Sequence, residues 1–431
     1  MFVIKYIIVF TLSNKLGDRI IISKLINNKG VKDSIIYLLG DMLSKLFPFI
    51  LLPYFTRVLG ADGYGELSLY QSFFAFIAIF VGLSSEGAVA RYFYFYGKRS
   101  IRYPIIASYL YISFVAIALI SIFLLFSRQE LVIVVFATWT YALLNIQLVI
   151  KQCAREPVKF IILQLLMSAL STLLTVLVFS FVDTKPIYRF LMMGVSNGIV
   201  VIIALVFFPT SKYKRVNFKN TKLSIGFILS FGFPLIFHQI SIYMKGQMDR
   251  FLLFFYFEPK DIGIYSASYQ LASLFLVVLL AINKAVVPIY YSALKNQSIT
   301  IDKIFSLAKL SLLIVPVPAL FCLLMPEYFY SLIFGKEFGS TKVMISMFVL
   351  GVSLMLPYFI MINYFFYFGK NFLISKITIS SSFAHILFVF IFCNISISLV
   401  PFSLILSNLF MVGTLMYVSH KETCRSNDEN K

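Results

Sequence analysis

Charged side chains within long apolar runs are the residues of this sequence that could do chemistry. Asp41 and Lys45 lie in an apolar run over 31–56, about 15–21 Å along a helix and close to the middle of a bilayer. Their i,i+4 spacing places them on one helix face, where they can neutralise each other. A charge at this depth costs about 2.5–3.5 kcal/mol on insertion scales. The pair therefore either ties helices together or, as we favour, faces a cavity used for substrate binding or ion coupling.

Further charges lie in or near the ends of later apolar runs: Glu86, Arg91, Lys245, Asp249, Arg250 and Lys284. Together with Asp41 and Lys45 they make five positive and three negative charges. The net positive sign favours an anionic ligand such as a diphosphate, held by charge-assisted hydrogen bonds. Arg91, Lys245 and Lys284 could instead reach interfacial water. Arg57, which follows the first run, could bind phosphate or anchor the end of a helix.

Two prolines and a histidine offer conformational or protonation chemistry. Pro48 and Pro234 are expected to kink their helices, as hinges of a moving helix or as ordinary membrane-helix prolines. His238 follows Pro234 by one helical turn and is either a protonation site or hydrogen-bonded within the bundle.

Enzyme motifs are missing from the sequence. It has no H-E-x-x-H, no Walker loop and no G-x-S-x-G in a strand–turn–helix setting. Three histidines in all disfavour metal catalysis. We therefore expect no catalytic residue, no metal, no cofactor and no nucleotide hydrolysis by this chain.

The elements that must position these residues are membrane helices. Of 431 residues, 60% are hydrophobic and only 13% are charged, against about 25% charged residues in soluble domains. A run of about 20 apolar residues crosses the hydrocarbon core as a helix. We expect twelve such helices, at 31–56, 66–90, 103–126, 130–150, 158–181, 187–209, 223–246, 262–283, 304–324, 342–366, 373–393 and 399–418. The short connections exclude a soluble catalytic domain and disfavour a polysaccharide polymerase with a long external loop.

The basic residues are distributed unevenly between the two sides of these helices. Each Lys or Arg near a helix end is assigned here to the adjacent connection. Of 37 Lys and Arg, 27 then lie before the first helix or after an even-numbered one, nine follow the odd-numbered ones, and Lys45 lies within the first helix. This bias predicts that both termini are cytoplasmic. The net charge of +19 therefore indicates membrane topology rather than nucleic-acid binding.

A weak internal repeat divides the chain. Phe47-Pro48 matches Phe233-Pro234, and the run from Gly65 to Gln71 matches the run from Gly263 to Gln270 with one residue inserted. Six helices separate the copies, so the two halves enter the membrane in the same direction. The predicted division is a cytoplasmic N-terminal extension over 1–30, an N-lobe over 31–216, a C-lobe over 217–420 and a cytoplasmic tail over 421–431. Gly60, Gly63 and Gly65 are expected to be turn residues.

Several segments resemble one family of membrane proteins. The run from Pro53 to Gly65, PYFTRVLGADGYG, resembles the signature that follows the first helix of the Wzx O-antigen flippases. These flippases belong to the multidrug/oligosaccharidyl-lipid/polysaccharide exporter superfamily. Gly82-Leu83 with Arg91, and Asp249-Arg250-Phe251 with Gly263-Ile264-Tyr265-Ser266, are similar to later landmarks of that family.

The resemblance implies an all-α protein with two six-helix bundles in a V shape, like the MATE transporters. It implies transport of an undecaprenyl-diphosphate-linked oligosaccharide from the cytoplasmic to the periplasmic leaflet of the bacterial inner membrane, without covalent chemistry. Its partners would be this lipid-linked substrate, membrane lipids and other polysaccharide assembly proteins. A small-molecule cation or drug antiporter of the same fold stays open as an alternative and would favour an acidic cavity. The sugar and a coupling ion, H⁺ or Na⁺, are left open.

Overall fold

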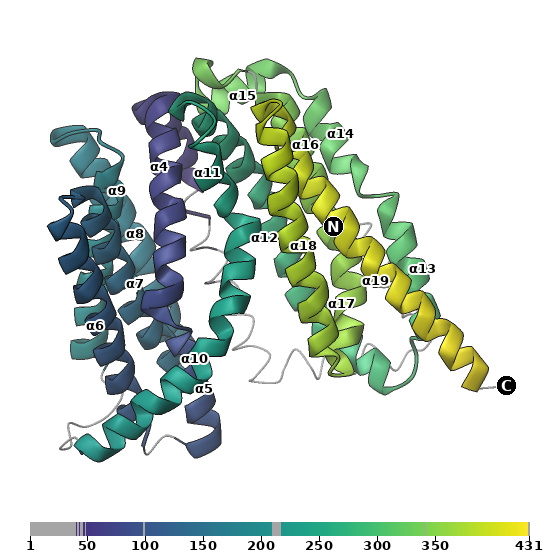
Figure 1. Cartoon of the computed structure of the whole chain (residues 1–431), viewed down its shortest axis with the longest axis horizontal. Helices are drawn as coiled ribbons and strands as arrows, with labels where there is room; N and C mark the ends of the chain where they lie inside the picture. Colours follow the sequence, from purple (N-terminus) through teal and green to yellow (C-terminus); the bar gives the residue numbers. More distant parts are fainter. Residues whose placement is uncertain are drawn as a thin grey trace.

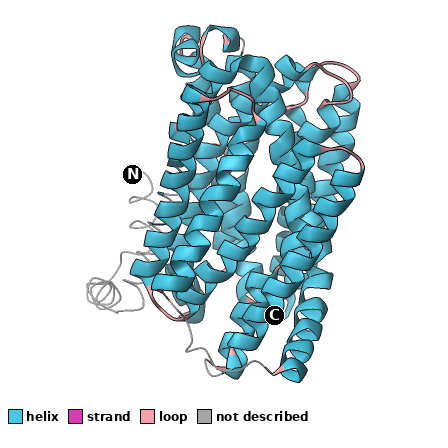
Figure 2. Ribbon diagram, turned by 90° about the vertical axis from the view of Figure 1, so that its left-hand side faces the viewer, coloured by secondary structure: helices cyan, strands magenta, loops and turns pink. Residues whose placement is uncertain are grey.

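The protein is built from membrane-spanning helices. The computed structural model describes residues 49–97, 100–208, 217–339 and 341–429, together with Gly40, Leu43, Leu46 and Phe47. These residues form helices and loops, and the described part of the chain contains no β-strand (Figure 2). It contains eleven stretches long and apolar enough to cross a membrane. Eleven of the twelve predicted helices are thus confirmed, whereas most of the predicted helix over 31–56 lies outside the described residues.

Most spans are one continuous helix, and a few are interrupted. The helices are α4 (Leu52–Gly82), α5 (Ser85–Tyr96), α6 (Arg102–Leu125), α7 (Gln129–Cys153), α8 (Pro157–Phe181), α9 (Ile187–Phe207), α10 (Phe218–Gly246), α11 (Met248–Leu253), α12 (Pro259–Lys295), α13 (Ile301–Leu312), α14 (Pro316–Leu324), α15 (Glu327–Phe334), η2 (Lys336–Phe338), α16 (Thr341–Ser353), α17 (Met355–Tyr367), α18 (Asn371–Cys393), η3 (Ile397–Leu399) and α19 (Phe402–Glu429).

A single glycine breaks α4. Gly60 has φ +67° and ψ −175°, a conformation that favours glycine, and helical geometry resumes at Ala61. The polar turn that we expected before residue 66 is therefore reduced to this one residue. The expectation that Gly63 and Gly65 are turn residues is wrong, because both lie within the resumed helix.

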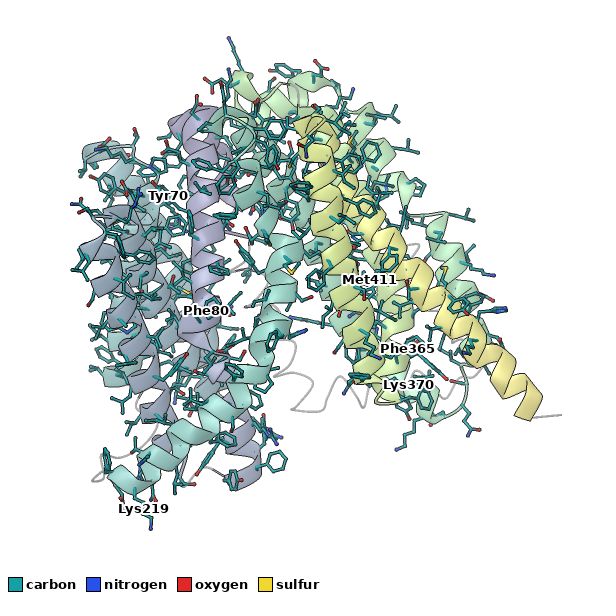
Figure 3. The ribbon with its side chains drawn as sticks, viewed as in Figure 1. Tyr70, Phe80, Lys219, Phe365, Lys370 and Met411 are labelled. Atoms are coloured by element: carbon teal, nitrogen blue, oxygen red, sulfur yellow. The ribbon has the colours of Figure 1, made fainter. Side chains whose placement is uncertain are left out.

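The helices form two groups. Figure 1 shows α4–α9 on one side and α12–α19 on the other, close together where α4, α11 and α15 meet and spreading apart toward the C-terminus. We call these the converging end and the diverging end. Lys219, at the start of α10, and Lys370, in the second group, both lie at the diverging end (Figure 3). The arrangement confirms the predicted all-α fold with two bundles in a V shape.

Helix α10 connects the two groups. It changes direction along its length (Figure 1) and packs against α5 and α6 of the first group and against α18 of the second. Pro234 lies inside this helix.

The two copies of the predicted repeat are in contact where α4 packs against α12, and we call this contact the seam. A Cβ atom placed on Gly65 would overlap the carbonyl oxygen of Pro259, and one placed on Gly263 would overlap that of Ala61. Both pairs of equivalent positions, Ala61 with Pro259 and Gly65 with Gly263, are related by the same offset of 198 residues. The contacts are reciprocal, as expected for two repeats related by an approximate two-fold axis.

Large apolar side chains cover the outer surface. Phe114, Leu125 and Phe181 are 74%, 83% and 82% exposed. Many further exposed Phe, Leu, Ile and Val residues accompany them on the spans. A surface of this kind requires an apolar solvent.

Candidate functional site

A buried ion pair lies at the junction of the two groups, where the short helix α11 connects α10 to α12. Asp249 and Arg250 are only 3% and 4% exposed. Nη1 of Arg250 donates hydrogen bonds to the backbone oxygen of Gly246 at 2.8 Å and to Oε1 of Gln247 at 3.0 Å. It lies 3.4 Å from Oδ1 of Asp249. The guanidinium is thus held by α11 and by the end of α10.

Two tyrosines of α12 complete the surroundings of this pair. The hydroxyl of Tyr265 donates to Oδ2 of Asp249 at 2.6 Å. The guanidinium carbon of Arg250 lies 4.5 Å from the ring centroid of Tyr269, within the range of a cation–π interaction. Burial alone would lower the pKa of Arg250, but Asp249 and the neighbouring tyrosines outweigh it and raise this pKa above its ordinary value. Arg250 is therefore a fixed positive charge.

Helix α4 contributes the first group's side of the junction. Oγ of Ser72 donates to the backbone oxygen of Gln247 at 2.9 Å and lies 3.0 Å from the hydroxyl of Tyr243. The rings of Phe73 and Phe251 meet edge to face, with centroids 5.6 Å apart. The Asp249–Arg250 pair is consequently enclosed by elements from both halves of the chain.

Helix α18 of the second group binds the end of α10. Nζ of Lys245 donates to Oγ of Ser381 at 2.8 Å, and that hydroxyl donates to the backbone oxygen of Ser407 at 2.8 Å. One turn earlier, Oγ of Ser241 donates to Oγ of Ser382 at 3.0 Å. Lys245 thus lies in the bundle, a few residues from Arg250, and bonds to a neighbouring helix.

Buried polar atoms without a hydrogen-bond partner lie on the neighbouring helices α18 and α19. Within the described residues, neither ring nitrogen of His385 has such a partner, nor does Oγ of Ser403 or Oδ1 of Asn408. His385 is only 2% exposed. Buried groups of this kind usually bind water or another ligand. In the sequence, His385 is a polar position within an apolar run that either lines a cavity or bonds to another helix, whereas Ser403 and Asn408 carry no distinguishing signal.

The remaining predicted charges lie away from the junction. On α5, Glu86 is half-buried and Arg91 is exposed. The guanidinium carbon of Arg91 lies 5.5 Å from the ring centroid of Phe95 and 5.6 Å from that of Phe231. Lys284 is exposed on α12. The structure therefore brings Lys245, Asp249 and Arg250 together and leaves these three residues outside that cluster.

Of the predicted hinges and the candidate protonation site, Pro234 and His238 belong to the described residues and Pro48 does not. Pro234 and His238 are both exposed on α10. Asp41, Lys45 and Pro48 lie outside the described residues.

Arg57 takes part in a contact between the groups at the converging end. Its Nη2 donates to the backbone oxygen of Leu332, near the end of α15. In a second contact between the groups, the backbone nitrogen of Ala61 donates a hydrogen bond to Oε2 of Glu337 at 2.9 Å. Glu337 therefore caps the helix that resumes after Gly60, a role that the sequence analysis missed.

Comparison with known proteins identifies the family. A family described as "Polysaccharide biosynthesis protein" matches residues 31–295, more than half of the chain. The chain belongs to the polysaccharide biosynthesis protein family. One relative is a putative protein of the Lsg locus of Haemophilus influenzae. It is 34% identical to this chain over 395 residues, which cover 91% of this chain and 98% of the relative. An uncharacterized membrane protein of the same organism is 38% identical to this chain over 344 residues, which cover 79% of this chain and 85% of that relative.

The fold of this polysaccharide biosynthesis protein is that of the MATE transporters. The inward-facing structure of a multidrug resistance MATE transporter of the MOP superfamily superposes with a TM-score of 0.65 at 13% identity, covering 90% of this chain and 99% of that one. The family and the fold together are those of a membrane transporter or flippase. The predicted family and fold class are confirmed.

Proposed function

We propose that this protein is a flippase that moves undecaprenyl-diphosphate-linked O-antigen or polysaccharide repeat units between the leaflets of the bacterial inner membrane. Movement is from the cytoplasmic to the periplasmic leaflet, with both termini in the cytoplasm. The observation that carries the proposal is membership of the polysaccharide biosynthesis family in a chain whose described part consists of transporter-type membrane helices. Such a chain moves a glycan across the membrane and performs no covalent chemistry.

The charges at the junction support an anionic headgroup as the ligand. Arg250 and Lys245 are both donors in a partly dehydrated setting, where hydrogen bonds to phosphate oxygens are strong. In the described residues, the bonds of the Arg250 guanidinium run through Nη1 alone. Nη2 and Nε are the atoms that we assign to a diphosphate.

The other candidate residues are assigned to the path of the substrate. In this proposal Asp41, Lys45, Glu86, Arg91 and Lys284 line successive positions of the cavity, and Arg57 contacts the headgroup on its release. Pro48 and Pro234 act as hinges. Asp249 holds Arg250, and His238 is a proton site should the coupling ion be H⁺ rather than Na⁺.

The arrangement of the two groups supports alternating access as the mechanism. The diverging end, with Lys219 and Lys370, faces the cytoplasm in this proposal, in agreement with the positive-inside bias. Opening the opposite side requires the seam between Gly65 and Gly263 to part, together with the bonds of Arg57 and Glu337. Binding of the lipid-linked glycan would supply the difference in affinity that shifts this equilibrium.

Deletion of the gene in its native host tests the proposal. We expect loss of the surface polysaccharide and accumulation of the lipid-linked repeat unit in the cytoplasmic leaflet, measured by lipid extraction and by protection from a membrane-impermeant glycan-modifying reagent. A plasmid copy of the wild type should restore both.

Two other outcomes would support the alternatives. Intact polysaccharide together with sensitivity to cationic dyes would indicate a drug antiporter. Single repeat units that reach the surface without being polymerised would indicate a polymerase.

A further inference from the structure

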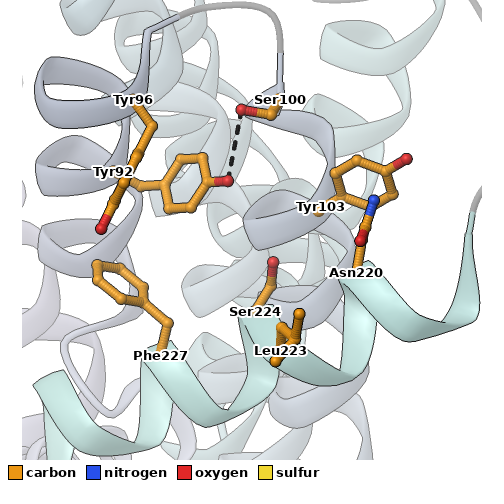
Figure 4. Close-up of a pocket in the computed structure, with 8 residues that line it drawn as sticks. All are labelled: Tyr92, Tyr96, Ser100, Tyr103, Asn220, Leu223, Ser224 and Phe227. Carbon is orange, nitrogen blue, oxygen red and sulfur yellow. Dashed lines mark hydrogen bonds between the residues drawn. The ribbon is translucent and has the colours of Figure 1, made fainter.

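A pocket of about 340 Å³ lies in the first group near the diverging end, between α5, the start of α6 and the first half of α10 (Figure 4). It is separate from the Asp249–Arg250 junction and contains none of the residues assigned a role above. Its volume lies at the lower end of the range for small-ligand sites, about 300–1,000 Å³. It can therefore hold one ring-sized group and not a whole oligosaccharide.

Aromatic rings form one side of the pocket. The ring centroids of Tyr92 and Tyr96 lie 4.7 Å apart, and the ring of Phe227 meets that of Tyr92 edge to face at 5.6 Å. Tyr96 is 63% exposed. These rings offer a face against which a flat apolar surface can stack.

Hydrogen-bonding groups occupy the opposite side. Ser100, Asn220 and Ser224 all line the pocket (Figure 4). The hydroxyl of Tyr92 lies 3.4 Å from Oγ of Ser100, which is a long bond that a closer ligand would replace. Amide and hydroxyl groups both donate and accept, as the hydroxyls of a ligand require.

An arginine fixes the remaining wall. Nη2 of Arg102 donates to the hydroxyl of Tyr103 at 2.8 Å, and its guanidinium carbon lies 4.7 Å from the Tyr103 ring centroid. Tyr103 is only 8% exposed. The described residues that line the pocket include no charged side chain.

We propose that this pocket binds one neutral sugar ring of the lipid-linked glycan at the predicted cytoplasmic side. A pyranose has an apolar C–H face that stacks on aromatic rings and a rim of hydroxyls that bond to amides and hydroxyls, and the pocket offers both. The described lining offers no carboxylate for a cationic drug and no charged side chain for the diphosphate, and it offers both kinds of surface that a neutral sugar contacts. The inference rests on the proposed function and names the glycan as the part of the substrate that is recognised here.

The pocket is joined to the helix that links the two groups. Asn220, Ser224 and Phe227 belong to α10, whose later turns bond to α18 through Ser241 and Lys245. A sugar held against these residues therefore contacts the element that must move when the groups rearrange.

Binding measurements on the purified protein in nanodiscs test the inference. The two probes are the lipid-linked repeat unit extracted from host cells that lack this gene, and undecaprenyl diphosphate without sugar. We expect Tyr96→Ala and Asn220→Ala each to raise the Kd for the glycan lipid about tenfold, since one stacked ring or one pair of hydrogen bonds is lost. The Kd for undecaprenyl diphosphate should not change. Tyr96→Phe, which keeps the ring, should retain most of the affinity.

Tyr94→Ala is the matched control, because Tyr94 lies on the same helix, is 70% exposed and does not line the pocket. The inference is overturned if Tyr96→Ala and Asn220→Ala bind the glycan lipid like the wild type. It is also overturned if they weaken both probes equally, or if Tyr94→Ala has the same effect, since the rings would then be an aromatic belt at the membrane interface. A wild type that binds neither probe would contradict the proposed function itself, and this inference with it.

Discussion

At the level of single residues, we expect both the proposed transport and the stability of the protein to depend on the Asp249–Arg250 pair. Removing one partner of a buried pair leaves an uncompensated charge and costs about 3–5 kcal/mol, whereas removing both can be nearly neutral. The hydroxyl of Tyr265 already bonds to Asp249 and can equally bond to an amide. Stability and ligand binding can therefore be separated by substitution.

We predict that Arg250→Gln lowers both the thermal stability of the purified protein and the amount of surface polysaccharide. The double variant Asp249→Asn/Arg250→Gln should regain most of the melting temperature but not transport, because the charge assigned to the diphosphate is still missing. Fluorescence-detected thermal unfolding and a polysaccharide assay in the deletion strain measure the two effects. Full transport by the double variant would reduce the pair to a structural role.

Residue types alone predicted some of this site and could not predict the rest. Lys245, Asp249 and Arg250 could be identified because a charge within or at the end of a long apolar run must bind a partner or reach the interface. Glu337 could not, because its partner, the backbone nitrogen of Ala61, lies 276 residues away in the chain. The intramembrane pair Asp41–Lys45 stays a prediction.

At the level of elements, hydropathy predicted the positions of the spans but not the close backbone contact between α4 and α12. An apolar run of sufficient length can satisfy its backbone within a bilayer only as a helix, so the predicted positions of eleven spans agree with the structure. The close contact of Gly65 with α12 involves a helix distant in the sequence. A glycine needed for close packing has the same local sequence as one needed for a turn, and of Gly60, Gly63 and Gly65 only Gly60 has a positive φ.

We predict that Gly65→Ala moves α4 and α12 apart at the converging end, because its Cβ would overlap the backbone of Pro259. Gly82→Ala is the matched control on the same helix, since a Cβ there meets no atom within 4 Å. With the native cysteines replaced, spin labels at Lys185 and Tyr328 report the separation by double electron–electron resonance. Equal distance distributions for the two variants would show that the seam tolerates the extra carbon.

At the level of the whole molecule, the two groups meet through backbone contacts at one end and are linked by α10 along their length. The reciprocal contacts of Ala61 with Gly263 and of Pro259 with Gly65 place the repeat axis at this seam. At this end the hydrophobic core is continuous across the seam, and the ring of Tyr64 on α4 meets that of Phe338 edge to face, with centroids 6.5 Å apart. In the proposed alternating access, parting the seam exposes buried apolar surface, and binding of the substrate must supply the compensating free energy.

The most direct test of the proposed flippase function is a flipping assay with the purified protein in proteoliposomes. The substrate is the lipid-linked repeat unit carrying a fluorescent sugar analogue. We predict that the wild type exposes inner-leaflet substrate to a membrane-impermeant quencher, so that quenching rises well above the half expected of protein-free liposomes. The Asp249→Asn/Arg250→Gln variant should stay near the protein-free value. Quenching by the wild type that does not exceed that of protein-free liposomes, in vesicles shown to contain the folded protein, would contradict the central claim that this chain moves the glycan lipid across the bilayer.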